Sequence, residues 1–218
     1  PYSEPVSAAE ELQRVIQVVR SLAEQVSVPI SIDTSKAIVA RECVAAGAQI
    51  INDVTGLEGD SGMLGVAVES GAGVCVMHMR GNPQTMQDNP AYDDVVGEIH
   101  QYLADRRDEL TGSGVLPTRI CLDPGIGFGK SAAHNVELMS GLSLFHGLGV
   151  PVLLGASRKR FIGTLSGVEE AGARVHGSVA AALHAVSQGA QIVRVHEVAA
   201  TRQALAVWQA ATLGALPE

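Results

Sequence analysis

The chain has 218 residues, of which 46% are hydrophobic and 17% are charged, a composition that can bury one large core and does not suit a disordered segment. We therefore expect residues 1–218 to form a single globular domain. The formal net charge of −8 argues against a non-specific nucleic-acid-binding surface, which needs an excess of Lys and Arg, and leaves small molecules as ligands.

The three cysteines are odd in number and far apart, and none forms a C-x-x-C pair, which fits a reducing cytoplasm. They are Cys43, Cys75 and Cys121, and the last two lie in apolar runs where a cysteine is a small buried hydrophobe. The chain has neither a run of about 18 apolar residues nor a signal-peptide pattern. We therefore expect a cytoplasmic protein without a membrane span.

The first predicted element is a helix over residues 7–26, in which Ser7 and Glu10 have the spacing of a capping box. Apolar residues recur along it every three or four positions, the pattern of a helix with one buried face. The same pattern predicts further helices over residues 36–46, 62–70, 91–110, 134–146, 175–187 and 199–211. Three of these segments are followed by Gly47, Gly71 and Gly189, which suit a left-handed turn into the next segment.

Six short apolar runs alternate with the predicted helices, and each run finishes at polar residues. Runs of four to six mostly β-branched or apolar residues are typical of strands buried on both faces of a parallel sheet. Their polar ends are Asp33, Asn52 with Asp53, His78, Asp123, Ser157, and Arg194 with His196. Strict alternation of strand and helix predicts a parallel sheet built from βα units.

Two parallel architectures compete, an open doubly wound sheet and a closed (β/α)8 TIM barrel. The doubly wound sheet needs G-x-G-x-x-G after its first strand, whereas "GIGFGK" has different glycine spacing and lies in the middle of the chain. A barrel gathers functional polar residues at the carboxyl ends of many strands, which is the pattern found here. We therefore predict an α/β TIM barrel. Because six strands are recognised, we expect about the first two strands and the first helix to lie upstream of Pro1.

The polar strand ends form a candidate ligand site. Asp33 and Asp123 offer carboxylates that can take paired hydrogen bonds from the N–H edge of a heterocycle, and Asn52 can both donate and accept. For each of these residues alone, capping the next helix or turn is the simpler role. The turn "SRKR" at residues 157–160 places basic side chains where a helix begins, which favours an anion or a carbonyl oxygen.

Four further polar residues have less specific signals. Arg194 and His196 alternate along the last predicted strand, so we expect them to face the same side and to share one anion. His78 is interpreted first as a capping or packed histidine. Lys130, at the end of the glycine-rich loop, has a solvated or capping role as its simplest interpretation.

The motifs "SIDTSK", "INDV", "MHMRGNPQTMQ", "LDPGIGFGK", "GASRKRFIG" and "RVHEV" resemble, in order and spacing, those of dihydropteroate synthases. The resemblance covers essentially the whole chain. It implies a TIM barrel that joins 6-hydroxymethyl-7,8-dihydropterin diphosphate to p-aminobenzoate in folate biosynthesis and releases diphosphate with the help of Mg²⁺. It also implies a cytoplasmic homodimer that sulfonamides inhibit.

The resemblance assigns site residues motif by motif. The pterin would be bound by Asp33, Asn52, Met77, Asp123, Gly155 and Lys159. Catalytic roles would fall to Asp33, Asp123 and Lys159. The diphosphate would be bound by Arg194 and His196, and p-aminobenzoate by Phe128 and Ser157. The loop of residues 80–92 would be a mobile cover.

Two departures and two alternatives accompany the resemblance. The family usually has Asp at the position of Glu197, and its Mg²⁺ ligand would lie upstream of Pro1, so no metal ligand is assigned within this chain. One alternative is a pterin-binding methyltetrahydrofolate methyltransferase domain, against which "SRK" and "RVHEV" argue. The other is a pterin-binding barrel without catalytic activity.

Overall fold

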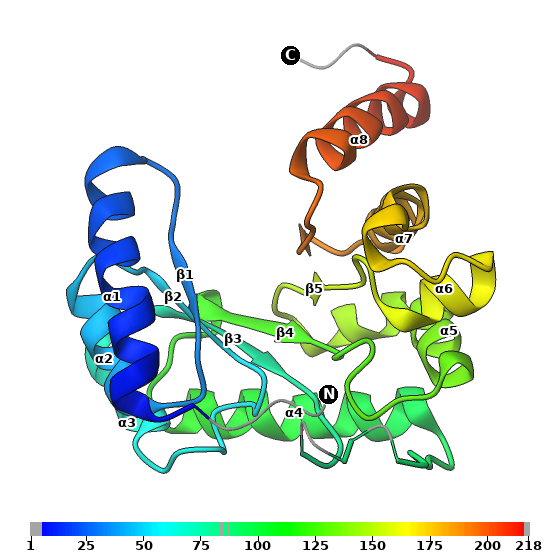
Figure 1. The fold of residues 1–218 in the computed structure, drawn as a ribbon. Helices are drawn as coiled ribbons and strands as arrows, with labels where there is room; N and C mark the ends of the chain where they lie inside the picture. The colour runs from blue at the N-terminus through cyan, green and yellow to red at the C-terminus, as the bar shows by residue number, and fades with distance from the viewer. Residues whose placement is uncertain (1–5, 83–84, 87, 216–218) are drawn as a thin grey trace.

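Six parallel strands follow one another in chain order along a curved sheet (Figure 1). The computed structural model describes residues 6–82, 85–86 and 88–215. The first four strands form one sheet: β1 (Ser31–Asp33), β2 (Ile50–Asp53), β3 (Gly73–Met77) and β4 (Ile120–Asp123). The other two, β5 (Leu153–Leu154) and β6 (Ile192–Val193), pair with each other. A single parallel bridge between Leu122 and Val152 joins the two sets.

Helices cover the outer face of this arc and alternate with its strands (Figure 1). They are α1 (Ala8–Gln25), α2 (Ala37–Ala45), α3 (Met63–Ser70), α4 (Val95–Gly112), α5 (Ala132–Ser140), α6 (Arg160–Ser166), α7 (Val175–Ser187) and α8 (Val198–Leu213). Short 3-10 turns lie at Pro117–Arg119, Leu142–Leu148 and Ala171–Ala173. Parallel strands in chain order with helices outside are the arrangement of the predicted TIM barrel.

The strand register decides which residues face the helices and which face the inside of the arc. Side chains alternate along a strand, so residues paired across neighbouring strands share a face. Ile32, Ile51, Val74 and Ile120 form one such row, and all four are buried in the core beneath the helices. Asp33, Asn52, Cys75 and Cys121 form the next row, on the inner face.

The local signals of the sequence are largely confirmed. All six predicted strands are present. The Ser7 hydroxyl accepts a hydrogen bond from the Glu10 amide at 3.2 Å and starts α1, which is one half of the predicted capping box, whereas the Glu10 carboxylate forms an ion pair with Arg14 at 2.5 Å. Gly47, Gly71 and Gly189 all adopt positive φ angles, of 116°, 63° and 94°. No helix within the described ranges is both long and apolar enough to cross a membrane.

The predicted helix over residues 134–146 is wrong in its extent. The structure has two elements there: α5 ends at Ser140, and after Gly141 a 3-10 helix runs from Leu142 to Leu148. Both elements place apolar residues against the core, so the apolar pattern continues through the break. Phe145 in the second element is completely buried, which explains why the spacing alone looks continuous.

Phe145→Ala should destabilise the protein by about 3 to 5 kcal/mol, because it leaves a cavity in the core. Its neighbour Leu144, which is 61% exposed, provides the matched control, and Leu144→Ala should change the stability by less than about 0.5 kcal/mol. Urea unfolding followed by circular dichroism measures both free energies. Equal losses in the two variants would contradict the assignment of this segment to the core.

Candidate functional site

The site lies at the carboxyl ends of the strands, where the register pairs four of the predicted residues. Asn52 is the direct partner of Asp33 across β1 and β2, and Met77 is the partner of Asp123 across β3 and β4. Asp53, by contrast, is fully buried on the opposite face, where its carboxylate accepts the amide hydrogens of Thr55 and Leu57. Asp53 therefore has a structural role in the β2–α3 turn.

Asp123 is a buried carboxylate that begins the glycine-rich loop of residues 125–129. It accepts the Gly125 amide hydrogen at 2.7 Å, while its backbone carbonyl accepts the amide hydrogen of His78 at 3.0 Å. Burial raises the pKa of Asp123, and the nearby Lys159 and the Gly125 N–H lower it again. A carboxylate in this position is ready to accept further N–H donors.

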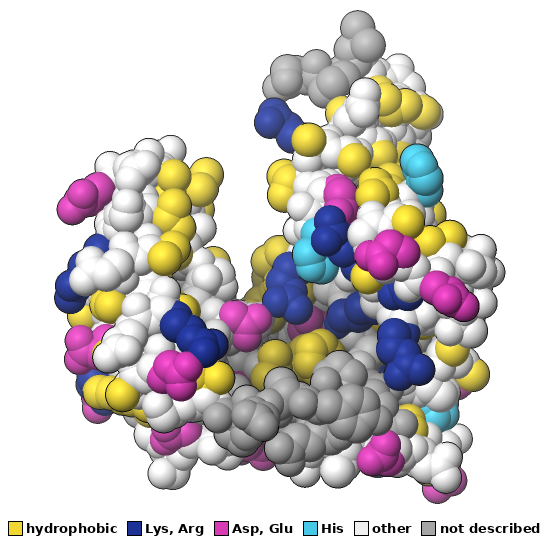
Figure 2. Space-filling view, in the orientation of Figure 1, with side chains coloured by type: hydrophobic (Ala, Val, Ile, Leu, Met, Phe, Trp, Pro, Cys, Tyr) yellow, Lys and Arg dark blue, Asp and Glu magenta, His cyan; other side chains and the backbone are white. Residues whose placement is uncertain are grey.

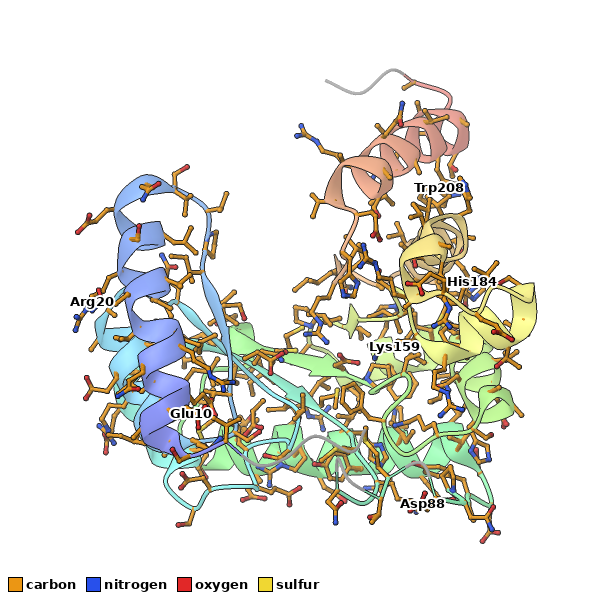
Figure 3. The ribbon with its side chains drawn as sticks, in the orientation of Figure 1. Glu10, Arg20, Asp88, Lys159, His184 and Trp208 are labelled. Atoms are coloured by element: carbon orange, nitrogen blue, oxygen red, sulfur yellow. The ribbon has the colours of Figure 1, made fainter. Side chains whose placement is uncertain are left out.

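Lys159 reaches back over the same loop from the start of α6 (Figure 3). Its ammonium lies 4.5 Å from the centre of the Phe128 ring and donates a hydrogen bond to the Ile126 carbonyl. Burial lowers the pKa of Lys159 to about 8, and Asp123 opposes this shift. Gly127 permits the approach, since a Cβ there would lie 3.0 Å from Lys159 Cδ. Lys159 therefore contacts Phe128 and lies near enough to Asp123 for each to affect the pKa of the other.

Arg194 and Asp33 form an ion pair of 3.0 Å that links the residue after β6 to the end of β1. Their side chains are 48% and 53% exposed, so the pair contributes at most about 1 kcal/mol and can be exchanged for other partners. Gly155 lies beneath this pair, because a Cβ there would lie 3.4 Å from Arg194 Nε. Arg194 therefore lies beside the predicted Asp33 and Gly155.

His196 contacts a different partner from Arg194. Its Nδ1 lies 2.9 Å from the Ser157 hydroxyl, which also accepts the His196 amide hydrogen at 3.3 Å. The last strand, β6, already ends at Val193, so the expected alternation of Arg194 and His196 along a strand is wrong. The two residues reach the same edge of the arc through the segment that follows the strand.

Glu197 forms an ion pair with Arg158, in which Arg158 Nε donates to Glu197 Oε1 at 2.8 Å. Arg158 holds the pKa of Glu197 below its ordinary value. The Arg158 backbone has a φ of 61°, an uncommon conformation for a side chain of this size, and its amide donates to Ser178 Oγ at 2.9 Å. The carboxylate of Glu197 therefore helps to hold the turn that presents Ser157 and Lys159.

The sequence analysis missed one residue that supports the loop. Asn135 on α5 is buried, and its Oδ1 accepts the Gly127 amide hydrogen at 2.7 Å. It shares the buried face of α5 with Leu138 and Met139. The sequence does contain a signal for this role: an asparagine on the apolar face of a predicted helix must be hydrogen-bonded when it is buried.

Two cavities are lined by some of these residues. A cavity of about 510 Å³ is lined by Asp33, Asn52 and Arg194. A second, of about 660 Å³, is lined by Phe128, Lys130, Lys159 and the basic turn. Figure 2 shows Lys and Arg side chains gathered along the hollow between the two arms of the molecule. The predicted cover, residues 80–92, includes residues 83, 84 and 87, which lie outside the described part of the chain, so its mobility is untested.

Known proteins resemble the chain in sequence and in structure. Residues 1–196 match a family model described as pterin binding enzyme. Dihydropteroate synthase from Escherichia coli strain K12 is 46% identical over 210 residues, which are 96% of this chain and 74% of that protein.

Two solved structures extend the comparison. The dihydropteroate synthase of Yersinia pestis with a sulfonamide drug complex has a TM-score of 0.94 and 43% identity, over 98% of this chain and 77% of that one. The enzyme from Xanthomonas albilineans in complex with 7,8-dihydropteroate has a TM-score of 0.90 and 46% identity, over 99% of this chain and 78% of that one. These likenesses confirm the predicted fold class.

Gly125→Ala should destabilise the protein by roughly 2 kcal/mol or more. Gly125 has a φ of 73°, and a Cβ would clash with the carbonyl oxygen of His78. Gly65, in the middle of α3 with open space around it, is the matched control, and Gly65→Ala should stabilise by up to about 1 kcal/mol. Urea unfolding compares them, and stabilisation by both substitutions would refute the close packing of this loop.

Proposed function

This chain belongs to the dihydropteroate synthase family of pterin binding enzymes, and we propose that the residues at its strand ends bind the two substrates of that family. The family reaction joins 6-hydroxymethyl-7,8-dihydropterin diphosphate to p-aminobenzoate and gives 7,8-dihydropteroate and diphosphate. The observation that carries the proposal is the convergence of Asp33, Asn52 and Asp123 with Lys159 at one edge of the sheet.

The pterin ring would lie against the row of residues at the ends of β1 to β4. Asp123 and Asp33 accept hydrogen bonds from the N–H edge of the ring, and Asn52 supplies a donor and an acceptor between them. Lys159, with its ammonium close to Asp123, donates to a ring carbonyl or nitrogen. Met77, the partner of Asp123 in the register, and Gly155, which lies against Arg194, would border the ring without polar side chains.

The p-aminobenzoate would enter through the neighbouring cavity. The half-buried Phe128 ring offers an apolar face to the aromatic ring, and Ser157 lies close enough to Lys159 in sequence to share the basic turn. A carboxylate at this turn gains from the basic side chains and from the amide dipoles at the start of the helix.

The chemistry breaks one C–O bond and forms one C–N bond. The bond between the pterin methylene and the diphosphate oxygen opens, and its electron pair leaves with diphosphate. Arg194 and His196 stabilise this developing negative charge, and Asp33 and Asp123 stabilise the positive charge left on the pterin. The aniline nitrogen then attacks the methylene carbon and loses a proton. The exchangeable pair between Arg194 and Asp33 suits this role, because Arg194 can turn to the leaving group.

We include Mg²⁺ as the cofactor on the strength of the family resemblance. Within the described ranges, no group of three or more His, Cys, Asp or Glu side chains could hold a metal ion. The residues proposed for the diphosphate are an arginine and a histidine, which do not form a Mg²⁺ site by themselves. The steps above therefore rest on the side chains of this chain alone.

The remaining proposals concern the organisation of the protein. We propose that residues 1–218 belong to one pterin-binding barrel domain that acts in the cytoplasm, where three free thiols remain reduced. A homodimer follows from the resemblance, and α8 exposes apolar side chains such as Val198 and Val207 that suit an interface. Release of diphosphate on mixing both substrates separates this function from a methyltransferase domain and from an inactive barrel.

Asp123→Asn should weaken dihydropterin binding by about 2 to 4 kcal/mol, because one charged acceptor becomes a mismatched donor. Titration calorimetry with a dihydropterin measures the loss, and circular dichroism checks that the fold is retained. Asp105→Asn, on the exposed face of α4, is the control and should bind like the wild type. A change smaller than about threefold for Asp123→Asn would exclude the proposed pterin contact.

Lys159→Ala and Arg194→Ala should differ in which ligand they bind more weakly. Lys159→Ala should weaken bare dihydropterin and its diphosphate ester alike, because Lys159 contacts the ring. Arg194→Ala should weaken the diphosphate ester by about tenfold more than the bare pterin, because its charge serves the leaving group. Calorimetry with both ligands and both variants decides, and equal losses in all four pairings would contradict the assignment.

A further inference from the structure

Lys130 is a buried charge to which the proposed reaction gives no role. Its side chain is 2% exposed, and it lies where the loop of residues 125–129 meets the residues that follow β3. Within the described residues it forms no ion pair with a carboxylate closer than 4.0 Å. A lysine that is removed from water in this way must be held by neutral acceptors.

The neutral partners of Lys130 match its hydrogen-bonding capacity. Its Nζ lies 3.0 Å from His78 Nδ1, 3.0 Å from the Phe128 carbonyl oxygen and 3.4 Å from the His78 carbonyl oxygen. An ammonium group has three donors and no acceptor, so these three acceptors satisfy it completely. Burial lowers the pKa of His78 to about 3, with help from Lys130 and Arg80, so the imidazole is neutral and Nδ1 accepts.

These contacts tie two segments of the site together. Gly125 and Gly129 lie against the backbone of residues 78–80 so closely that a Cβ on either would clash with a carbonyl oxygen there. Lys130 joins the segments on the buried side. On the other side, the Tyr92 hydroxyl donates to the Gly129 carbonyl at 2.9 Å. Together with the contacts of Asn135 to the Gly127 amide and of Lys159 to the Ile126 carbonyl, these two contacts hold the loop that contains Phe128.

We propose that Lys130 is a positioning residue, whose buried side chain fixes the loop of residues 125–129 and, through that loop, the Phe128 and Asp123 side chains that face the two substrates. In this inference Lys130 acts through its contacts with Phe128 and His78, although it also borders the cavity proposed for p-aminobenzoate. The second part of the inference rests on the function proposed above, whereas the first part holds for the free protein.

The charges that face Lys130 determine the sign of the expected pH effect. Asp123 at the end of β4 raises the pKa of Lys130, while burial lowers it to about 7, helped by Lys159 before α6 and Arg80 after β3. Glu98 of α4 acts on His78 and raises its pKa slightly against the lowering causes. Conversely, Lys130 is one of the cations that lower the pKa of Asp123. Removing Lys130 should therefore let the pKa of Asp123 rise.

Three variants separate the charge from the loop contact. Lys130→Met removes both the charge and the contacts, and Lys130→Gln keeps hydrogen-bond donors without the charge. Tyr92→Phe removes the hydrogen bond from the Tyr92 hydroxyl to the Gly129 carbonyl of the same loop. Lys36→Met is the control, because Lys36 pairs with Glu11 outside this cluster. Two measurements are made on each: amide hydrogen exchange of residues 125–129 without ligand, and calorimetry of a dihydropterin from about pH 4 to 8.

The inference requires the amides of the loop to exchange about threefold faster or more in Lys130→Met than in the wild type. It also requires the acid limb, the pH range in which dihydropterin binding is lost as the pH falls, to lie at least about half a pH unit higher in this variant. Lys130→Gln should move the acid limb likewise, whereas Tyr92→Phe should speed exchange but leave the limb in place. Loop amides as protected as in the wild type, or an unmoved limb in Lys130→Met and Lys130→Gln, would overturn it. If the wild type binds no dihydropterin, the proposed function fails, and the exchange experiment still tests the loop contact.

Discussion

The parallel register of β1 to β4 is the constraint on which the site depends. Because Asp33 pairs with Asn52 and Met77 with Asp123, four strands that are separate in sequence deliver their terminal side chains to one edge and one face. A shift of one residue in any of these pairs would turn the polar end into the core beneath the helices. The buried row of Ile32, Ile51, Val74 and Ile120 opposes such a shift, since its apolar side chains fix the register from the other face.

The burial of charged side chains is the second constraint, and the glycines of the loop allow backbone groups to come close enough to bind these charges. Asp123 and Lys130 are buried and Lys159 is half-buried, which is costly unless each charge finds partners. Backbone groups of the loop supply many of them: the Gly125 amide for Asp123, the Phe128 carbonyl for Lys130 and the Ile126 carbonyl for Lys159. Larger residues at positions 125, 127 and 129 would keep these backbone groups too far from the charged side chains to bind them.

The sequence predicts the fold well, and it predicts that polar strand ends gather at one edge of the sheet, because both depend on local patterns. Apolar runs that end in polar residues identify all six strands, and their alternation with helices gives the parallel order. The break after Ser140 is not predictable in this way, because apolar side chains line the core on both sides of it. The burial of Lys130 is not predictable either, since its partners include a histidine 52 residues away and backbone carbonyls that any residue type has.

The ion pair between Asp33 and Arg194 joins residues 161 positions apart. Asp33, Asn52 and Asp123 are brought together by pairings within β1 to β4, whereas Arg194 arrives only when the chain beyond β5 has folded back. The entropy of closing so long a loop grows only slowly with length, so the separation has a small effect on stability. Its effect on kinetics is larger, because contacts of high sequence separation form late. The strand ends of β1 to β4 can thus assemble before Arg194 joins them.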